Sequence, residues 1–500
     1  MKQYKNFSWV VILMLPLLSV FSGCKKFLDR KPLGVATQGD LSQGGVEGNT
    51  FGLYGKLRDV DGMTTFPRLW FQSIRSDDAQ KGSTTGDLAD GGQIMDDFQY
   101  SKDHWLMNTN WDGHYNFINA TNDVIHEVDS LGLNDPGSQI NLAEARFFRA
   151  FAYFDLVRDY GEVPKIDFKI YKIDDGNKPK ATVPELYAFI EEDLNFAAAT
   201  LPATWASAFA GRLTSGAAKT LLAKVLLYQK KWGDALAKAE EVINSGNYAL
   251  LPSYQNYFEE KGENSSESIF EVQMYENKGG SVYFGNNYNQ VQGVRGSGDW
   301  DLGWGFNVPT QTLVDAYEPG DPRKDATILY SGQPDGIYGR TLPPAPPLVQ
   351  PYWNKKVYTD IARQQETGDR FSWWLNIRLL RYADVLLMAA EAANELGGAA
   401  NTTKALDYLE QVRARARGGN NAVLPPVTTT DQALLRAAIH RERRFEFAME
   451  NERFYDLVRW GEALTVLGPL GYQARNALYP IPQPAIDRSN GVLKQNPNYP

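Results

Sequence analysis

The chain has 500 residues, of which 43% are hydrophobic and 22% charged, a composition typical of a large globular protein whose two subdomains share one core. Its formal net charge is −9, and the sequence contains no basic run. Because nucleic-acid binding depends on neutralising phosphates, this charge balance argues against a nucleic-acid partner.

The first residues have the parts of an export signal. Two lysines precede an apolar stretch over 7–21, which is interrupted by Pro16 and is too short for a membrane span of about 20 residues. The only cysteine of the chain, Cys24, follows directly, so an internal disulfide is excluded. The segment 22–24 (SGC) resembles a bacterial lipobox. We therefore expect residues 1–23 to be a lipoprotein signal peptide and Cys24 to carry a lipid anchor.

After this signal, a polar tether is expected over 24–43, followed by several amphipathic helices within the region 44–250. In each of these segments the apolar residues recur at three- and four-residue steps, which places them on one helix face. The predicted helices cover residues 46–58, 111–130, 141–160 and 183–199.

The stretch from 212 to 248 predicts a helical hairpin. Apolar residues over 218–228 form one helix face, and a second helix is expected over 235–243 with Asp234 as its N-cap. Two short antiparallel helices with small residues at their contact are typical of the tetratricopeptide repeat, whose unit is about 34 residues. One such hairpin cannot bury its own apolar face, so it needs helical neighbours.

Further helices are predicted in the C-terminal region 376–500. A helix over 382–396 and a returning partner over 403–415 form a second hairpin, and a long final helix is expected over 431–460. The sequence therefore predicts a mostly α fold, a tetratricopeptide-like scaffold of about four helix pairs.

The region 251–375 interrupts this pattern and reads as a loop-rich insertion. So long an irregular segment in a compact domain usually has a function, and its aromatic content argues against disorder. Eight of the twelve tryptophans lie in the non-helical zones of the chain: Trp70, Trp105, Trp111, Trp300, Trp304, Trp353, Trp373 and Trp374. Flat aromatic faces suit the apolar faces of sugar rings, although any single tryptophan is more often a core residue than a ligand platform.

Patterns for catalysis or cofactor binding are missing from the sequence. The four histidines show no ligand spacing for a metal, and no phosphate-binding loop, dinucleotide fingerprint or nucleophile elbow is present. Asp77-Asp78 and Asp96-Asp97 are adjacent acids that could suggest glycoside hydrolysis, but adjacency alone is a weak signal. We therefore expect no catalytic residue, no metal site and no cofactor.

Two other charged motifs predict ion pairs that stabilise the fold. Asp321-Pro322-Arg323 predicts a turn stabilised by a charge pair. In the segment 441–453, Glu446 is expected to pair with Arg443, and Glu450 with Arg453, at helical spacing.

Several motifs, taken in this order, resemble the SusD/RagB family of outer-membrane lipoproteins, which are associated with TonB-dependent transporters. The resemblance covers essentially the whole chain after the signal. The motifs are CKKFLD (24–29), AEARFFRAFAYFDLVRDYGEVP (143–164), VPTQTLVDAYEPGDPR (308–323), RLLRYADVLLMAAEAANELG (378–397), ERFYDLVRWG (452–461) and YPIPQPAIDRSNGVLKQNPNY (479–499). One departure is Asn451-Glu452, where the family commonly has a glycine before the arginine.

The resemblance implies a non-catalytic protein that binds oligosaccharides and hands them to a TonB-dependent transporter, as a lid anchored in the outer membrane and facing the cell surface. Trp105 and Asn108 occupy the W-x-x-N position of the sugar platform, Trp300 and Trp304 match the opposing aromatic region, and Tyr283 is a further candidate ligand contact. Two alternatives stay open: a scaffold or lid for a transporter of peptides or other non-glycan cargo, and a hydrolase.

Overall fold

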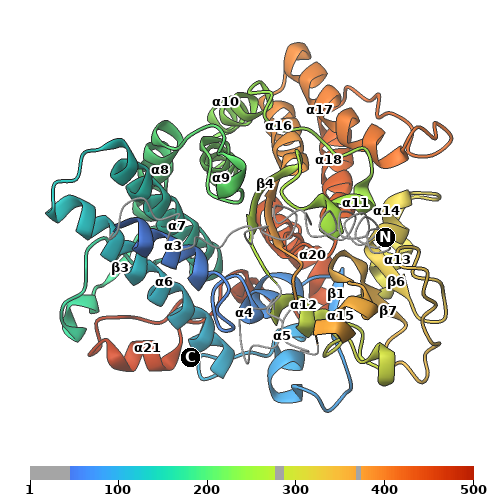
Figure 1. Ribbon diagram of the computed structural model, residues 1–500, viewed down its shortest axis with the longest axis horizontal. Coiled ribbons are helices and arrows are strands. Elements are labelled where there is room, and N and C mark those ends of the chain that lie inside the picture. The colour runs from blue at the N-terminus through green and yellow to red at the C-terminus, as the bar shows by residue number, and fades with distance from the viewer. Residues whose placement is uncertain (1–45, 276–286, 368–372, 500) are drawn as a thin grey trace, which may run out of the picture.

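The computed structural model describes residues 46–275, 287–367 and 373–499. Most of the described chain is helical (Figure 1). The long helices are α3 (Val46–Lys56), α6 (Trp105–Ser130), α7 (Pro136–Tyr160), α8 (Val183–Thr200), α9 (Ser215–Tyr228), α10 (Trp232–Ile243), α16 (Tyr382–Leu396), α17 (Ala399–Arg417), α18 (Gln432–Glu446) and α19 (Arg453–Trp460).

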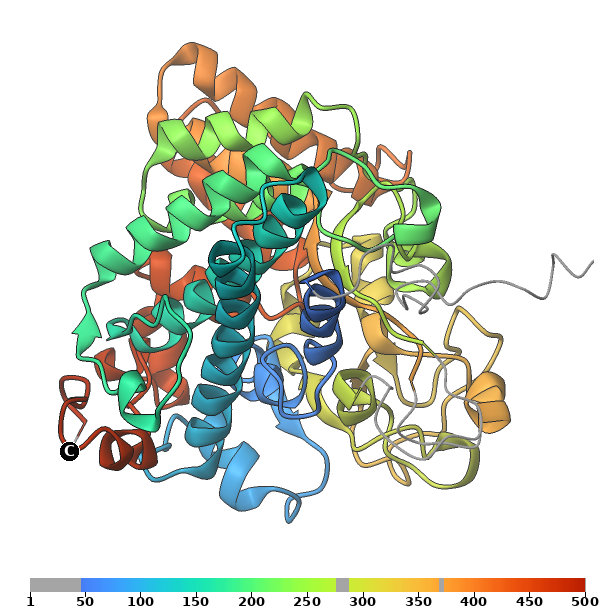
Figure 2. The same ribbon diagram turned by 60° about the vertical axis from the view of Figure 1, so that its left-hand side comes forward.

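Successive helices of the scaffold pack against one another from α6 through α10, and then α10 packs against α16 and α16 against α17. Figures 1 and 2 show these helices following one another in an arc. The neighbours α10 and α16 come from opposite ends of the insertion, so the helical stack continues across it. This arrangement confirms the predicted mostly α fold with a tetratricopeptide-like scaffold.

Local signals explain where the helices of the scaffold begin. Asp135 caps α7 by accepting from the backbone N–H of Ser138, and Pro136 fills the first turn. Thr182 and Glu185 form a capping box at the start of α8. The prediction that Asp234 caps α10 is wrong, because Lys231 holds that position and its carbonyl accepts the first helical bond, from Ala235.

The predicted single helix over 431–460 is also wrong, although Asp431 does cap its start. The chain leaves the helix after Glu446, at the end of α18, and starts again at α19. Met449 and Asn451 between them have left-handed backbone angles, with φ of 65° and 68°. Asparagine tolerates this conformation better than most residues, so Asn451 suits the break between the two helices.

The insertion is built from short elements. Its helices are α11 (Tyr254–Phe258), α12 (Asn287–Gln292), α13 (Gln311–Ala316), α14 (Pro322–Thr327) and α15 (Ile361–Thr367). The strands of the described chain, inside and outside the insertion, form four antiparallel pairs. These are β1 (Ala79–Gly82) with β5 (Phe306–Pro309), β2 (Val163–Pro164) with β3 (Lys180–Ala181), β4 (Ser268–Val272) with β8 (Ile377–Arg381), and β6 (Ile328–Tyr330) with β7 (Tyr352–Asn354). The pair β4–β8 closes the base of the insertion, directly before α16.

The insertion has a small hydrophobic core of its own, separate from the main core around the helices. Val308, Leu329, Trp353 and Trp373 belong to it. Of the eight tryptophans assigned above to the non-helical zones, five are at least 95% buried, so most of that enrichment reflects packing: Trp70, Trp111, Trp353, Trp373 and Trp374. Trp111 moreover lies inside α6, which begins six residues earlier than predicted.

Buried charges join the insertion to the C-terminal helices. Asp321 pairs with Arg323, which confirms the predicted charge pair, and the segment forms the start of α14 with Asp321 as its N-cap. Glu446 of α18 contacts the guanidinium groups of Arg323, Arg381 and Arg415, so its predicted pairing with Arg443 is wrong. We call Glu446 and these three arginines the Glu446 junction.

The partners of Arg453 and Glu450 also differ from the prediction. Arg453 pairs with Asp77, and Glu450 accepts from Arg381 and Lys356. These pairs are long-range in sequence because the helix breaks between Glu446 and Arg453, and the break removes the spacing on which the prediction depended.

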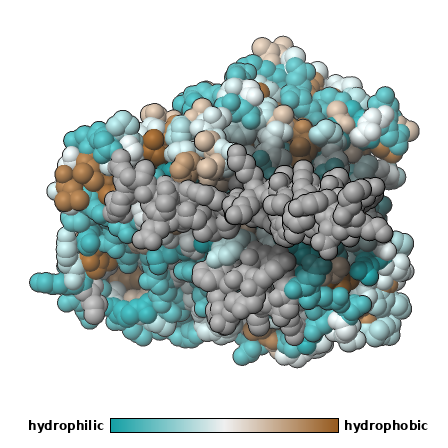
Figure 3. All heavy atoms as spheres, viewed as in Figure 1, coloured by the Kyte–Doolittle hydropathy of each residue, from teal (hydrophilic) through white to brown (hydrophobic). Residues whose placement is uncertain are grey.

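The described residues on one face of the molecule are mainly hydrophilic (Figure 3). Figure 3 shows hydrophobic residues in small groups among hydrophilic ones on the face seen in Figure 1. No helix in the described ranges combines the length and the hydropathy needed to cross a bilayer.

Candidate functional site

Trp105 lies at the start of α6 and is one of the few large hydrophobic side chains that solvent reaches, with 43% of its surface exposed. Its indole stacks on the ring of Phe66, with centroids 6.3 Å apart and planes 16° from parallel. The imidazole ring of His104 is nearly parallel to the indole, with the two ring centroids 6.0 Å apart. The exposed ring thus has two nearly parallel aromatic neighbours.

Phe66 is held in place by a buried aromatic group beneath it. It opens the short helix α4 (Phe66–Arg68), which continues into the π-helical turn η1 (Leu69–Ser73). In that turn, fully buried Trp70 contacts Phe66 at 5.6 Å and Phe306 of β5 at 5.2 Å. A Cβ at Gly92 would lie 2.5 Å from the Trp70 ring, so only glycine allows this packing.

The second predicted aromatic, Trp304, comes from a tight loop of the insertion. Gly293 and Gly303 lie back to back in this loop, where a Cβ on Gly303 would be 2.6 Å from the Cα of Gly293. The Trp304 amide donates to the carbonyl of Gln290 at 3.0 Å. These contacts place the Trp304 ring at 6.5 Å from Phe66, with the planes at 71°. The structure therefore brings Trp105 and Trp304 together around one ring, Phe66.

The other predicted aromatics do not join this group. Trp300 ends the short turn η6 (Gly298–Trp300), is half-buried, and packs against the core of the insertion. Tyr283 and the predicted lipidation site Cys24 lie outside the described residues.

Polar atoms without partners lie beside Trp105. The Nδ2 of Asn108 donates to Asp112 at 2.8 Å, whereas its Oδ1 is buried and has no hydrogen-bond partner in the described ranges. Asp112 also accepts from Arg488 of α21 (Gln483–Arg488) at 2.6 Å. A buried acceptor without a partner carries a desolvation penalty that a bound donor removes.

The segment between β1 and α6 lies next to the Trp105 ring. It contains η2 (Ala89–Gln93) and α5 (Ile94–Asp96). The Nε2 of His104 lies 3.0 Å from the carbonyl oxygen of Asp90, and a Cβ on Gly91 would be 3.4 Å from the Trp105 ring. Burial lowers the pKa of His104, which favours a neutral ring at neutral pH. Arg295 of the Trp304 loop pairs with Asp87 at 2.5 Å, and this ion pair links that loop to the segment between β1 and α6.

This arrangement suits noncovalent binding. Within the described ranges there is no group of three or more histidine, cysteine or acidic side chains that could hold a metal ion. The adjacent acids Asp77 and Asp78 are occupied by ion pairs with Arg453 and Arg444, at 2.8 and 2.6 Å. Flat rings next to unpaired polar atoms can bind a ligand that has both apolar faces and hydroxyl groups.

Sequence reasoning did not identify Phe66 or His104 as parts of this group, and it named Trp70 only as one of the eight tryptophans in the non-helical zones. The signals available were weak, because Phe66 and Trp70 lie far from Trp105 in the sequence and only the fold brings them together. The local pattern of an aromatic pair at spacing four, next to Pro67, is equally typical of a buried helical turn.

Comparisons with known proteins agree with this fold. A family model described as "SusD family" matches residues 266–477, and one described as "Starch-binding associating with outer membrane" matches residues 70–227. The SusD-like protein P2 of Formosa agariphila is 28% identical over 83% of this chain and 86% of its own.

Solved structures are similar over almost the whole chain. A laminarin-binding SusD-like protein is 29% identical with a TM-score of 0.75, over 91% of this chain and 99% of that one. The surface glycan-binding protein A from Bacteroides fluxus is 25% identical with a TM-score of 0.74, over 93% of this chain and 100% of its own.

Proposed function

This chain belongs to the SusD/RagB family, and from that premise we propose that it binds oligosaccharides without cleaving them and delivers them to a TonB-dependent transporter. Similarity to a laminarin-binding protein and to a surface glycan-binding protein supports a glycan as the ligand. Laminarin is therefore the first polysaccharide to test.

One observation carries the proposal: Trp105 and Trp304 both pack on Phe66, and the buried Oδ1 of Asn108, about one turn along α6 from Trp105, has no partner in the described ranges. A sugar ring stacks its C–H face on the exposed indole of Trp105. One of its hydroxyl groups then donates to Asn108, which removes the desolvation penalty of that acceptor. The supporting rings hold Trp105 in place before binding, so little side-chain entropy is lost.

The test is affinity electrophoresis on a polysaccharide panel that includes laminarin. Wild type is compared with Trp105→Ala, Trp304→Ala and Trp300→Ala, and Tyr171→Ala serves as a control because Tyr171 is a 69% exposed aromatic outside this group. We expect retardation of the wild type and the control, and loss of retardation for Trp105→Ala and Trp304→Ala. Unchanged migration of both variants on a retarding glycan would falsify the site.

Membrane attachment is a separate part of the proposal. Cys24 is expected to receive the lipid, so Cys24→Ser leaves the protein in the soluble fraction while wild type partitions with the outer membrane. Protease treatment of whole cells checks whether the protein faces the outside. A pull-down from native membranes checks the transporter. Co-purification of a transporter without binding to any glycan of the panel would favour non-glycan cargo, and release of reducing ends would establish a hydrolase.

A further inference from the structure

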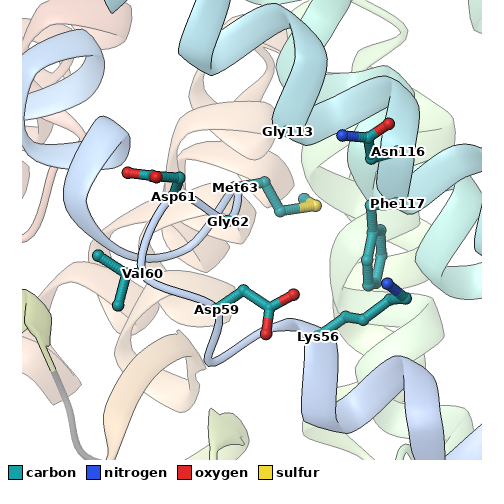
Figure 4. Close-up of a pocket in the computed structure, with 9 residues that line it drawn as sticks. All are labelled: Lys56, Asp59, Val60, Asp61, Gly62, Met63, Gly113, Asn116 and Phe117. Atoms are coloured by element: carbon teal, nitrogen blue, oxygen red, sulfur yellow. The ribbon is translucent and has the colours of Figure 1, made fainter. Parts of the chain in front are cut away.

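A pocket of about 590 Å³ opens on the side of α6, three turns beyond Trp105 (Figure 4). One wall is the end of α3 and the loop after it, and the other is the α6 surface at Gly113, Asn116 and Phe117. The loop can approach the helix because position 113 is glycine, where a Cβ would lie 2.8 Å from the carbonyl oxygen of Asp61.

The polar side chains of this pocket have no partners. The side chains of Lys56 and Asp59, from the loop side, and of Asn116, from α6, form no hydrogen bond or ion pair with any other described residue, and all three residues are exposed. In Figure 4 the Asp59 carboxylate turns into the space between loop and helix, while Val60 and Asp61 point away from it. The pocket thus combines a carboxylate acceptor, an ammonium donor and an amide that does both.

Asp59 is an exposed residue whose carboxylate loses only part of its hydration in this position. Burial raises its pKa from the ordinary value, and the nearby positive charges of Lys56 and Arg58 only oppose that shift. A hydroxyl donor placed against the carboxylate would return part of the lost hydration. A polyhydroxylated ligand fits this set of groups, because its hydroxyls donate to Asp59 and accept from Lys56 and Asn116.

The pocket and Trp105 lie on one face of the same helix. Positions 105 and 116 are eleven residues apart, which is almost a whole number of turns and about 16 Å along the axis. Trp105 and Asn116 are exposed, and Asp112 between them keeps 35% of its side chain accessible. One extended ligand can therefore contact both ends of this face.

We propose that the pocket at Lys56, Asp59 and Asn116 is a second sugar subsite, which binds a distant unit of the same glycan chain that stacks on Trp105. This inference rests on the proposed glycan-binding function and adds a dependence on chain length. Short oligosaccharides contact Trp105 alone, whereas longer ones gain hydrogen bonds in the pocket.

The test is calorimetry on the mature protein with oligosaccharides of three and six sugar units, cut from the polysaccharide that retards wild type most strongly. If that is laminarin, the probes are laminaritriose and laminarihexaose. We expect the hexamer to bind wild type about tenfold more tightly than the trimer, as a charged hydrogen bond provides. Asp59→Ala with Asn116→Ala should bring the two affinities within about threefold, and trimer binding should not change.

Controls separate this inference from the proposed function. Asp129→Ala changes an exposed acid of α6 outside the pocket and should keep the wild-type ratio. The single variant Asn116→Ala, at an exposed position, repeats the measurement if the double variant is poorly folded. A double variant that keeps the full length dependence overturns the subsite and leaves the Trp105 site standing. Binding that depends on the pocket but not on Trp105 overturns the proposed site instead, and a protein that binds no polysaccharide overturns both.

Discussion

Two polar regions of this protein differ in whether their buried groups have partners. At the Glu446 junction, one carboxylate contacts three guanidinium groups, and every member comes from a different element: α18, α14, β8 and α17. Beside Trp105, the buried Oδ1 of Asn108 has no partner in the described part of the chain. The first pattern stabilises the fold, and the second leaves binding free energy for a ligand.

Two carboxylates, one in each region, differ in the same way in their pKa values. Burial would raise the pKa of Glu446, but the three arginines outweigh it and lower the pKa to about 2. Asp96, in the segment between β1 and α6, accepts a hydrogen bond from the backbone N–H of Lys81 at 2.9 Å. Burial dominates there and raises its pKa to about 7. The number of positive partners decides the direction of the shift.

The largest expected effect comes from breaking the Glu446 junction. Glu446→Gln keeps the shape but removes the one charge that the three buried guanidinium groups share, although each also pairs with another carboxylate. We expect the free energy of unfolding to fall by about 3–5 kcal/mol, measured by urea denaturation. The matched control is Glu410→Gln, whose partner is Arg417 at 2.5 Å but whose side chain is 37% exposed. That change should cost about 0–1 kcal/mol. Equal losses in the two variants would contradict the comparison.

The next effect is a change in pH dependence at Asp96. Its folded pKa of about 7 lies above the unfolded value of about 3.9, so the folded state binds the extra proton between these limits. Stability from this group is therefore full below about pH 4 and is lost as the pH rises through 7. Asp96→Asn removes this loss, and we expect its stability advantage over wild type to grow by about 2–4 kcal/mol from about pH 4 to pH 8.

The neighbouring residue provides the control for this measurement. Asp97 is exposed, and Asp97→Asn should shift the thermal unfolding curve little at any pH. A difference between wild type and Asp96→Asn that stays constant with pH would show that Asp96 is ionised in the folded protein.

Sequence patterns were sufficient for the scaffold because its signals are local. Apolar spacing located α7 to α10, α16 and α17, since each helix buries one face against its neighbours. The break after Glu446 was not predictable from spacing, because Met449 adopts a left-handed conformation that its residue type does not signal. The partners of Glu446 were missed for a related reason: they come from elements that only the folded chain brings together.

The candidate site was only partly predictable from the sequence. Trp105, Trp304 and Asn108 were identified through the family resemblance. The structure places both tryptophans against Phe66, and Asn108 lies about one turn along α6 from Trp105. Exposure could not be predicted, because Trp70 and Trp105 both lie outside the periodic segments and yet one is fully buried and the other 43% exposed. Burial here depends on long-range packing, through Phe306 and Gly92 in the case of Trp70.

The smallest expected effect on stability separates two asparagines of the same helix, α6. Asn122 has both ends of its amide paired, with Ile166 and Arg149 at 2.9 Å each, so Asn122→Ala should cost about 2–3 kcal/mol and leave glycan affinity unchanged. Asn108→Ala removes an acceptor that has no partner and one hydrogen bond to Asp112. Its cost in stability should stay below about 1 kcal/mol, while glycan affinity falls about five- to tenfold. Urea denaturation and calorimetry on both variants check this crossing pattern. If Asn108→Ala destabilised the fold as much as Asn122→Ala and left affinity intact, the unpaired oxygen would have no role in binding, and the contrast with the Glu446 junction would lose its functional meaning.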